Sequence, residues 1–393
     1  MKRNLLLVIV LAVVSASAQQ RNNTVPSFTG AVEDFKPNAT NQPGRQYPMV
    51  NSQGAVRVQL RAPGATSVQL DLGRRYEMVK DERGVWTATS APQDVGFHYY
   101  QLIVDGTPMP DPGTVSFFGA GRWGSGIEIP SSDMDFWQVK NVPQGSMGEV
   151  YYYSTYTEKM RRCFVYLPNE YFTNPTKKFP VLYLQHGMGE NEYSWPYQGH
   201  VASIMDNLIA EKKAVPFIVV MDNGLNANAP RPAGQAPQGG QRPQGGFGGF
   251  GGFGGGFADG FKNVLFNDII PMIEKNYRVI ADPEHRAYSG LSMGGMQARE
   301  ITLANPGKFA YVGSFSSGAW SVDQVKNSEG FAQKTKLLFM SGGGKENMGC
   351  VEAAKKIKEQ LGMNAVGYES EGTAHEFHTW RRSLHEFAQL LFK

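Results

Sequence analysis

The sequence has few cysteines and little net charge. Of its 393 residues only Cys163 and Cys350 are cysteines, too few for a protein held together by a disulfide framework. One bond between them or two buried free thiols are both compatible with the sequence, and we favour the thiols. The net charge is +3, and Lys and Arg do not cluster with aromatic residues, so we expect no nucleic-acid partner.

Metal-binding and nucleotide-binding patterns are also missing. His and Cys residues do not show the spacing of a zinc site, and no P-loop or dinucleotide-type glycine pattern opens a predicted helix. We therefore expect neither a metal nor a cofactor. Beyond the N-terminus, the sequence has no segment with the roughly 18 apolar residues of a membrane-spanning helix. The expected class is a globular protein that works with its own side chains.

The N-terminus has the pattern of a cleaved secretion signal. Two basic residues precede an apolar run at 5–14, and the small residues at 16–18 form a cleavage site. We interpret residues 1–18 as a signal peptide and expect a secreted or periplasmic protein. No cysteine lies near the cleavage site, so we expect no lipid anchor to the membrane.

The chain that follows begins with a region of short strands. Residues 19–48 are polar and are expected to form a flexible lead-in. Between 49 and 130, apolar and polar residues alternate with a period of two, which predicts a small β-sandwich. Its predicted strands are 56–60, 68–72, 85–89 and 97–104. Residues 131–148 are expected to form a linker.

Residues 149–393 alternate predicted strands and helices. This order is typical of an α/β domain whose mostly parallel sheet is covered by helices on both faces. The predicted strands are 179–184, 217–221, 285–289, 337–340 and 365–369, and the predicted helices are 202–210, 261–277, 296–304, 350–361 and 380–392. The segment 226–260 breaks the pattern because it is rich in glycine and poor in large side chains. We predict a disordered loop there, either an inert insertion or a flap that touches substrate.

A serine motif lies between one predicted strand and the helix after it. Residues 289–295 read Ser-Gly-Leu-Ser-Met-Gly-Gly and contain Gly-x-Ser-x-Gly around Ser292. In a nucleophile elbow the serine occupies a sharp strand-to-helix turn, which needs small neighbours because the backbone folds closely on itself. We therefore predict that Ser292 is a catalytic nucleophile.

A serine hydroxyl is a weak nucleophile unless a base takes its proton and an acid orients that base. His375 lies in a loop between the strand 365–369 and the last helix, where it can reach an elbow serine. Two later histidines, His378 and His385, belong to the last helix or lie beside it. We predict that His375 is the base.

The acid is expected in the loop after the strand 337–340, because it follows the serine and precedes the histidine in this arrangement. Glu346 is the carboxylate of that loop. Glu352 begins a helix, where a carboxylate commonly serves the helix dipole, and Asp323 precedes the required strand. We therefore predict that Glu346 is the acid.

The tetrahedral intermediate of acyl transfer needs two N–H donors for its oxyanion. One is expected from Met293, the residue after the nucleophile. The other is expected from Met188, in the loop 186–189 that follows the strand 179–184. His186, which begins this loop, is expected to fix it by hydrogen bonding rather than to take part in catalysis.

These residues resemble the esterase-D-like α/β-hydrolases and, within them, the carbohydrate-esterase group of feruloyl and acetylxylan esterases. The resemblance lies in the elbow motif, the loop 186–189 and the segment 372–377 with the tryptophan that follows it. It implies an α/β-hydrolase fold. It also makes three residues candidates for substrate binding: His186, Trp195 and Trp380.

The region 49–130 resembles the early-set immunoglobulin-like domains related to glycogen-binding modules. An exposed Trp86 or Trp123 could stack on a sugar there, although a core or interface role is the simpler interpretation.

Two positions of the region 149–393 depart from the esterase pattern. Many relatives carry Asp where the acid loop here reads Glu346-Asn347. If Asn347 stands at the position of that Asp, Glu346 must supply the carboxylate from the position before it. Met188 stands where relatives often have Gly, which narrows the mouth of the pocket.

The resemblance implies a secreted serine carboxylesterase that removes feruloyl or acetyl groups from a plant polysaccharide such as xylan through an acyl-enzyme. Two alternatives stay open. The same triad could serve another acyl esterase, such as a siderophore esterase, or an acyltransferase of the same fold. The chain could also be a non-catalytic glycan-binding protein with a degenerate site.

Overall fold

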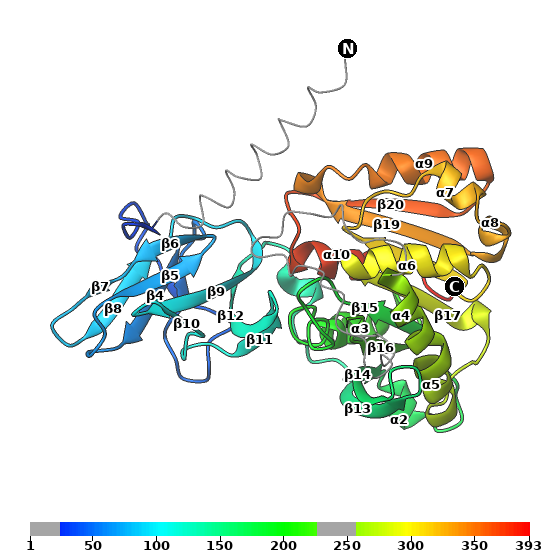
Figure 1. The fold of residues 1–393 in the computed structure, drawn as a ribbon, viewed down its shortest axis with the longest axis horizontal. Helices are drawn as coiled ribbons and strands as arrows, with labels where there is room; N and C mark the ends of the chain where they lie inside the picture. Colours follow the sequence, from blue (N-terminus) through cyan, green and yellow to red (C-terminus); the bar gives the residue numbers. More distant parts are fainter. Residues whose placement is uncertain (1–23, 226–256) are drawn as a thin grey trace, which may run out of the picture. The chain divides into compact units, whose positions relative to one another are not determined.

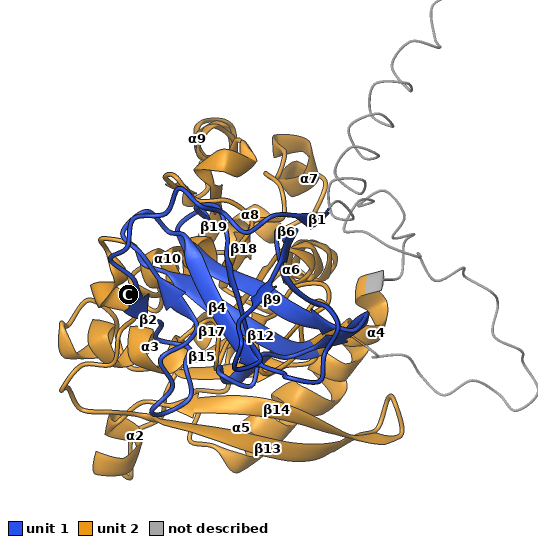
Figure 2. Cartoon of the chain, turned by 90° about the vertical axis from the view of Figure 1, so that its left-hand side faces the viewer, with its two compact units in different colours: residues 1–117, 123–130, 231–253 blue, residues 118–122, 131–230, 254–393 orange. Residues whose placement is uncertain are grey.

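The computed structural model describes residues 24–225 and 257–393 (Figure 1). The predicted signal peptide and most of the predicted Gly-rich loop, residues 226–256, lie outside the described residues. The described chain divides into two compact units (Figure 2). Unit 1 contains residues 24–117 and 123–130, and unit 2 contains 118–122, 131–225 and 257–393. Among the described residues, none of the helices has the length and apolar character needed to span a membrane.

Unit 1 is a β-sandwich. One sheet has the order β1-β6-β5-β9-β12-β11, with β10 paired to β9, and the other has the order β2-β3-β4-β8-β7. The strands are β1 (Thr24–Val25), β2 (Lys36–Pro37), β3 (Met49–Val50), β4 (Val56–Arg61), β5 (Val68–Leu72), β6 (Arg74–Glu77), β7 (Val79–Lys80), β8 (Val85–Thr89), β9 (Gly96–Val104), β10 (Thr107–Met109), β11 (Ser116–Gly119) and β12 (Arg122–Ile129).

The core of unit 1 follows from the period-two pattern. Val56, Val58 and Leu60 of β4 are buried, and so are alternate residues of β5 in the other sheet, because successive side chains of a strand point to opposite faces. Trp86 is 7% exposed and belongs to this core, so it offers no ring to a sugar. Trp123 is 47% exposed.

The expectation of a flexible lead-in is wrong for residues 24–48. β1 pairs with β6, and β2 pairs with β3. The buried side chain of Asn38 donates to the carbonyl of Glu128 at 2.7 Å and accepts from its N–H at 3.2 Å. The polar composition that suggested disorder therefore satisfies buried backbone groups of the sandwich.

Unit 2 is built on an eight-stranded sheet of order β13-β14-β16-β15-β17-β18-β19-β20. The first two pairings, β13 with β14 and β14 with β16, are antiparallel, and the others are parallel. The strands are β13 (Ser146–Ser154), β14 (Lys159–Leu167), β15 (Val181–Gln185), β16 (Ile218–Asp222), β17 (Arg286–Leu291), β18 (Tyr311–Phe315), β19 (Leu337–Gly343) and β20 (Ala365–Ser370).

Helices cover both faces of this sheet, as the β-α alternation predicts. The helices of unit 2 are α2 (Glu170–Thr173), α3 (Val201–Ala210), α4 (Phe257–Val264), α5 (Ile270–Asn276), α6 (Met293–Ala304), α7 (Val322–Lys326), α8 (Phe331–Lys334), α9 (Cys350–Leu361) and α10 (Phe377–Ala388). Leu338 and Met340 of β19 join one core with residues of α4, α6 and α9. Phe339, which points to the opposite face, packs on Phe387 of α10.

Three boundaries differ from the expectations. The predicted linker 131–148 contains a 3₁₀ turn, η1 (Met134–Phe136), and the start of β13, and its Trp137 is buried against His200 in unit 2. The last four residues of the predicted Gly-rich loop, 257–260, begin α4. The last helix begins at Phe377 rather than at 380. Both cysteines are buried free thiols.

Candidate active site

Ser292 lies at the sharp turn between β17 and α6. Its backbone angles are φ 50° and ψ −113°, which a residue with a side chain rarely adopts and which costs about 1–3 kcal/mol. The surrounding structure holds this geometry, because the N–H of Ser292 donates to the carbonyl of Phe315 at 2.7 Å. The residue is 5% exposed, so its hydroxyl meets solvent over a small area.

Two glycines of the motif allow this turn to pack. A Cβ placed on Gly290 would lie 2.5 Å from the carbonyl carbon of Gly294, and one on Gly294 would lie 2.6 Å from the carbonyl oxygen of His186. Both obstacles are backbone atoms, which cannot rotate away. The small residues of the motif thus bring the start of α6 against the loop that follows β15.

The structure brings Ser292, His375 and Glu346 together in one line of hydrogen bonds. His375 Nε2 lies 3.0 Å from Ser292 Oγ, and His375 Nδ1 lies 2.6 Å from Glu346 Oε1. The ring tautomer follows from these partners: Nδ1–H donates to the carboxylate, and Nε2 accepts from the hydroxyl. This arrangement can take the proton of Ser292 and hold the resulting imidazolium beside a carboxylate.

Glu346 is held by two further donors. Its Oε2 accepts from Ser316 Oγ at 2.6 Å and from the N–H of Gly343 at 2.7 Å, and the side chain is 7% exposed. Burial opposes ionisation of this carboxyl, but the hydrogen bonds from His375, Ser316 and Gly343 outweigh it and lower its pKa. Glu346 is therefore the side chain of the Glu346-Asn347 pair that contacts His375, and it is ionised at neutral pH.

The acid loop and the base loop are joined through their backbones. The N–H of Lys345 donates to the carbonyl of Thr373 at 2.9 Å. Thr373 in turn donates its hydroxyl to the carbonyl of Ser370, at the end of β20, at 2.9 Å. His375 follows two residues later, so its position depends on both strands, β19 and β20.

The two predicted oxyanion donors both lie in segments next to Ser292. Met293 is the first residue of α6, at the positive end of the helix dipole. Met188 belongs to the loop beside the serine, since a Cβ on neighbouring Gly187 would lie 3.4 Å from Ser292 Cβ. Across the described parts of the chain, no protein acceptor takes the N–H of Met188 or of Met293. Both groups are free to bind a ligand oxygen.

His186 is a buried ring behind this loop, so its predicted contact with substrate is wrong. It is 1% exposed. Its Nδ1–H donates to the carbonyl of Gly187 at 2.7 Å, and its Nε2 accepts from the N–H of Gly224 at 3.1 Å. Burial lowers its pKa to about 4, so the ring is neutral and ties the oxyanion loop to the segment after β16.

The two tryptophans proposed to bind substrate are also buried. Trp195 is 1% exposed, and its Nε1–H donates to the carbonyl of Gln185 at 2.9 Å. Trp380 is 5% exposed and packs edge-on against the His375 ring, with the ring centres 5.1 Å apart. The substrate-binding prediction is therefore wrong for Trp195, which supports the loop. For Trp380, which packs on His375 and is as exposed as Ser292, it stays a prediction. The sequence shows where aromatic residues occur but not which of their side chains reach the surface.

Two supporting features were missed in the sequence. The hydroxyl of Ser316 contacts Glu346. This serine follows β18, a strand that was not predicted because the strand contains Gly and Ser. Behind the oxyanion loop, the buried Glu192 accepts from Arg162 at 2.7 Å and from Asn223 at 2.9 Å. The two glutamates at 190 and 192, which follow the loop 186–189, were the available signal.

The described residues hold no group of three or more His, Cys, Asp or Glu side chains arranged to bind a metal ion. The groups gathered around Ser292 are a hydroxyl, an imidazole, a carboxylate and free backbone N–H donors. Such a set is suited to acyl transfer through a serine nucleophile.

Comparison with known proteins gives a consistent result. The model of the Esterase family, described as "Putative esterase", matches residues 154–390. An endo-1,4-beta-xylanase/feruloyl esterase of Xylanibacter ruminicola is 45% identical over 370 residues, which are 92% of this chain and 48% of that protein. The chain thus spans about half the length of this relative.

Solved structures show the same fold at lower sequence identity. A ferulic acid esterase from Anaeromyces mucronatus matches with a TM-score of 0.52 and 21% identity, over 67% of this chain and 96% of that one. An enterochelin esterase from Shigella flexneri matches with a TM-score of 0.59 and 14% identity, over 86% and 92% of the two chains. The predicted fold class, an α/β-hydrolase domain preceded by a small β-sandwich, is confirmed.

Proposed function

The chain belongs to the esterase family, and we propose that it is a serine carboxylesterase that releases feruloyl groups from xylan. The observation that carries the proposal is the line of hydrogen bonds from Ser292 through His375 to Glu346. The substrate class is supported by the 45% identity to a xylanase/feruloyl esterase over 92% of the chain. Acetyl groups on the same polysaccharide are the second acyl group to consider.

In the proposed reaction Ser292 Oγ attacks the acyl carbon while His375 Nε2 takes the hydroxyl proton. The carbonyl oxygen becomes an oxyanion, which the N–H groups of Met188 and Met293 stabilise. The C–O bond to the sugar then breaks, and His375 returns the proton to the leaving sugar oxygen. Glu346 stays ionised and stabilises the imidazolium without taking its proton.

The acyl-enzyme is then hydrolysed by the same groups. Water attacks the acyl carbon and gives its proton to His375, and collapse of the second intermediate releases the carboxylic acid and restores Ser292. A second oxyanion forms at the same place, so one pair of N–H donors serves both halves of the reaction. Both halves of the reaction use the substrate, water, these three side chains and the two backbone N–H donors.

The proposal includes a location outside the cytoplasm, which rests on the predicted signal peptide at 1–18. It also includes the polysaccharide as partner. A non-catalytic glycan-binding role is less well supported, because a degenerate site would lack the Glu346–His375 contact at 2.6 Å. Transfer to an acceptor other than water uses the same triad and differs only in what attacks the acyl-enzyme.

Ser292→Ala tests the proposal. We expect the purified protein to hydrolyse methyl ferulate and the Ala variant to lose about 10⁶-fold in kcat. Ser52→Ala, at an exposed position of unit 1, is the matched control and should keep full activity. Equal turnover by the wild type and Ser292→Ala would overturn the proposal. Comparing kcat/KM for methyl ferulate with acetate release from acetylated xylan assigns the acyl group, and adding a sugar acceptor detects transfer.

A further inference from the structure

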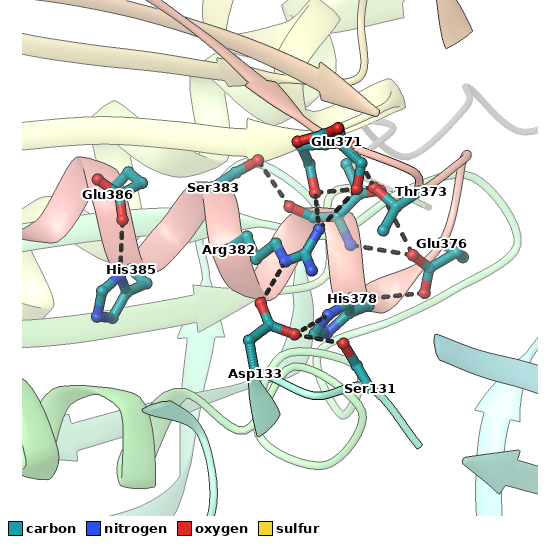
Figure 3. Close-up of polar contacts among 12 residues, drawn as sticks. Ser131, Asp133, Glu371, Thr373, Glu376, His378, Arg382, Ser383, His385 and Glu386 are labelled. Carbon is teal, nitrogen blue, oxygen red and sulfur yellow. Dashed lines mark hydrogen bonds and ion pairs between the residues drawn. The ribbon is translucent and has the colours of Figure 1, made fainter. Parts of the chain in front are cut away.

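A polar cluster outside the line of three residues described above joins α10 to the segment that carries Asp133 (Figure 3). Asp133 accepts from Arg382 Nε at 2.7 Å and from His378 Nε2 at 3.0 Å. The hydroxyl of Ser131 also donates to Asp133. Asp133 comes from the stretch that connects β12 to β13, whereas Arg382 and His378 lie on the last helix. These three residues and Ser131 all belong to unit 2.

Arg382 also reaches the chain that leads to His375. Its Nη1 donates to Ser370 Oγ at 3.1 Å and to the carbonyl of Glu371 at 2.9 Å. These acceptors mark the place where the chain leaves β20 and turns toward α10. The guanidinium thus links three segments: Asp133, the end of β20 and its own helix.

The loop that carries His375 is tied down at its other end as well. Ser370 Oγ, which accepts from Arg382, also lies 2.8 Å from Thr373 Oγ1. Thr373 accepts from Thr379 Oγ1 at 2.6 Å. Glu376 accepts from the N–H of Thr379 at 3.0 Å and caps α10. His375 therefore sits on a short loop whose start depends on Arg382 and whose end depends on the helix cap.

The charges in the cluster make Asp133 and Arg382 the paired ions. Burial opposes ionisation of Asp133, but hydrogen bonds from Arg382 and Ser131 outweigh it and hold its pKa well below the usual range. Burial, followed by the positive charge of Arg382, lowers the pKa of His378, so its ring is neutral and donates through Nε2. The anion at 133 thus fixes the direction of the guanidinium, whose several N–H groups can serve several acceptors at once.

We propose that Arg382, oriented by Asp133, is a positioning residue that holds the His375 loop at the distance needed for proton transfer from Ser292. The inference rests on the proposed function, because it assigns a role within that reaction. Proton transfer requires hydrogen-bond reach, and a displacement of about 1 Å can reduce the rate on the order of 10²-fold. Substrate binding needs neither residue, so the loss falls on kcat.

Arg382→Lys separates charge from geometry. A lysine keeps a positive charge beside Asp133, but its compact ammonium cannot also reach both Ser370 and Glu371. We expect kcat for methyl ferulate to fall by about 10- to 10²-fold with KM unchanged. Labelling of Ser292 by a fluorophosphonate should slow by a similar factor, since it also needs the base.

Asp133→Asn is the second variant, of nearly the same size, and should show the same loss in kcat and in labelling. The matched control is Asp135→Asn, because Asp135 is 83% exposed, pairs with Lys140 and lies two residues away. It should behave like the wild type. Thermal unfolding of each variant reports stability separately from activity.

Wild-type kcat in Arg382→Lys and Asp133→Asn would overturn this inference and leave the proposed function standing. So would a loss of folded protein in both, which would show that the cluster carries stability rather than position. A rise in KM with kcat unchanged would also overturn it. A wild-type protein without turnover of methyl ferulate would instead overturn the proposed function.

Discussion

The two halves of the candidate active site are held in different ways. The nucleophile half consists of Ser292 and the oxyanion loop 186–189, and close backbone contacts at glycines define it. The acid–base half consists of the loops 344–347 and 371–376, and side-chain hydrogen bonds define it. Its supports come from far along the chain: Asp133 and His378 are 245 residues apart. The nucleophile half is therefore fixed by close backbone packing, and the acid–base half is fixed by side-chain contacts.

Apart from removal of the nucleophile itself, the largest effect should come from the acid–base half. Glu346→Gln keeps the size of the side chain but removes the charge that stabilises the imidazolium and selects the ring tautomer of His375. We expect kcat for methyl ferulate to fall on the order of 10⁴-fold, or about 5 kcal/mol. Glu352→Gln, at an exposed position in the first turn of α9, is the matched control. A loss below tenfold in Glu346→Gln would remove Glu346 from the triad.

The nucleophile half should respond to pH through a buried ring. The pKa of His186 is lowered from 6.5 to about 4. Between these pH values the unfolded chain binds a proton at this ring and the folded chain does not. For this group the free energy of unfolding is highest above pH 6.5. It falls as the pH drops toward 4, by at most about 3 kcal/mol.

His186→Asn removes this titration while keeping a donor near Gly187. The free energy of unfolding, measured with urea at about pH 7 and about pH 4, should depend less on pH in the variant than in the wild type. Other buried histidines are common to both proteins and cancel in the difference. Equal pH dependence in the two proteins would contradict the neutral, buried state of His186.

A glycine substitution tests the claim that backbone contacts define the nucleophile half. In Gly294→Ala the new Cβ would lie 2.6 Å from the carbonyl oxygen of His186 and push on the oxyanion loop. Alanine favours a helix by about 1 kcal/mol, but overpacking costs about 1–3 kcal/mol, so we expect a net loss of stability together with lower kcat. Gly148→Ala is the control, because its Cβ would meet no atom within 4 Å. Wild-type stability and kcat in Gly294→Ala would contradict the claim that this backbone contact defines the nucleophile half.

The smallest effect is expected next to the acid. Asn347 has φ 52°, a left-handed conformation that Asn and Asp tolerate better than most residues, and it follows the carboxylate that contacts His375. Asn347→Asp should change kcat and stability little, within about 0.5 kcal/mol. In the Glu346→Gln background it should not restore activity. Recovery of activity in that double variant would show that position 347 can supply the acid.

Much of the fold was predictable because its signals are periodic. Alternation over β4 and β5 and the strand–helix order around β17 and α6 were visible in the sequence. The edge strand β13 and the central strand β18 were not. β13 exposes Tyr151 and Tyr153, and β18 is a short buried run with Gly and Ser, so neither has the apolar pattern of a typical strand.

The amino-acid sequence alone predicted the nucleophile and the order of the site, with Ser292 before the acid and His375 last. It could do so because the elbow is formed by neighbouring residues, whose backbone geometry depends on their own small size. The folded structure was needed to show that Glu346 rather than its neighbour faces His375, that Trp195 is buried, and that Arg382 reaches Ser370. Those outcomes depend on which side chains the packing of distant strands and helices brings together, and no local pattern records it.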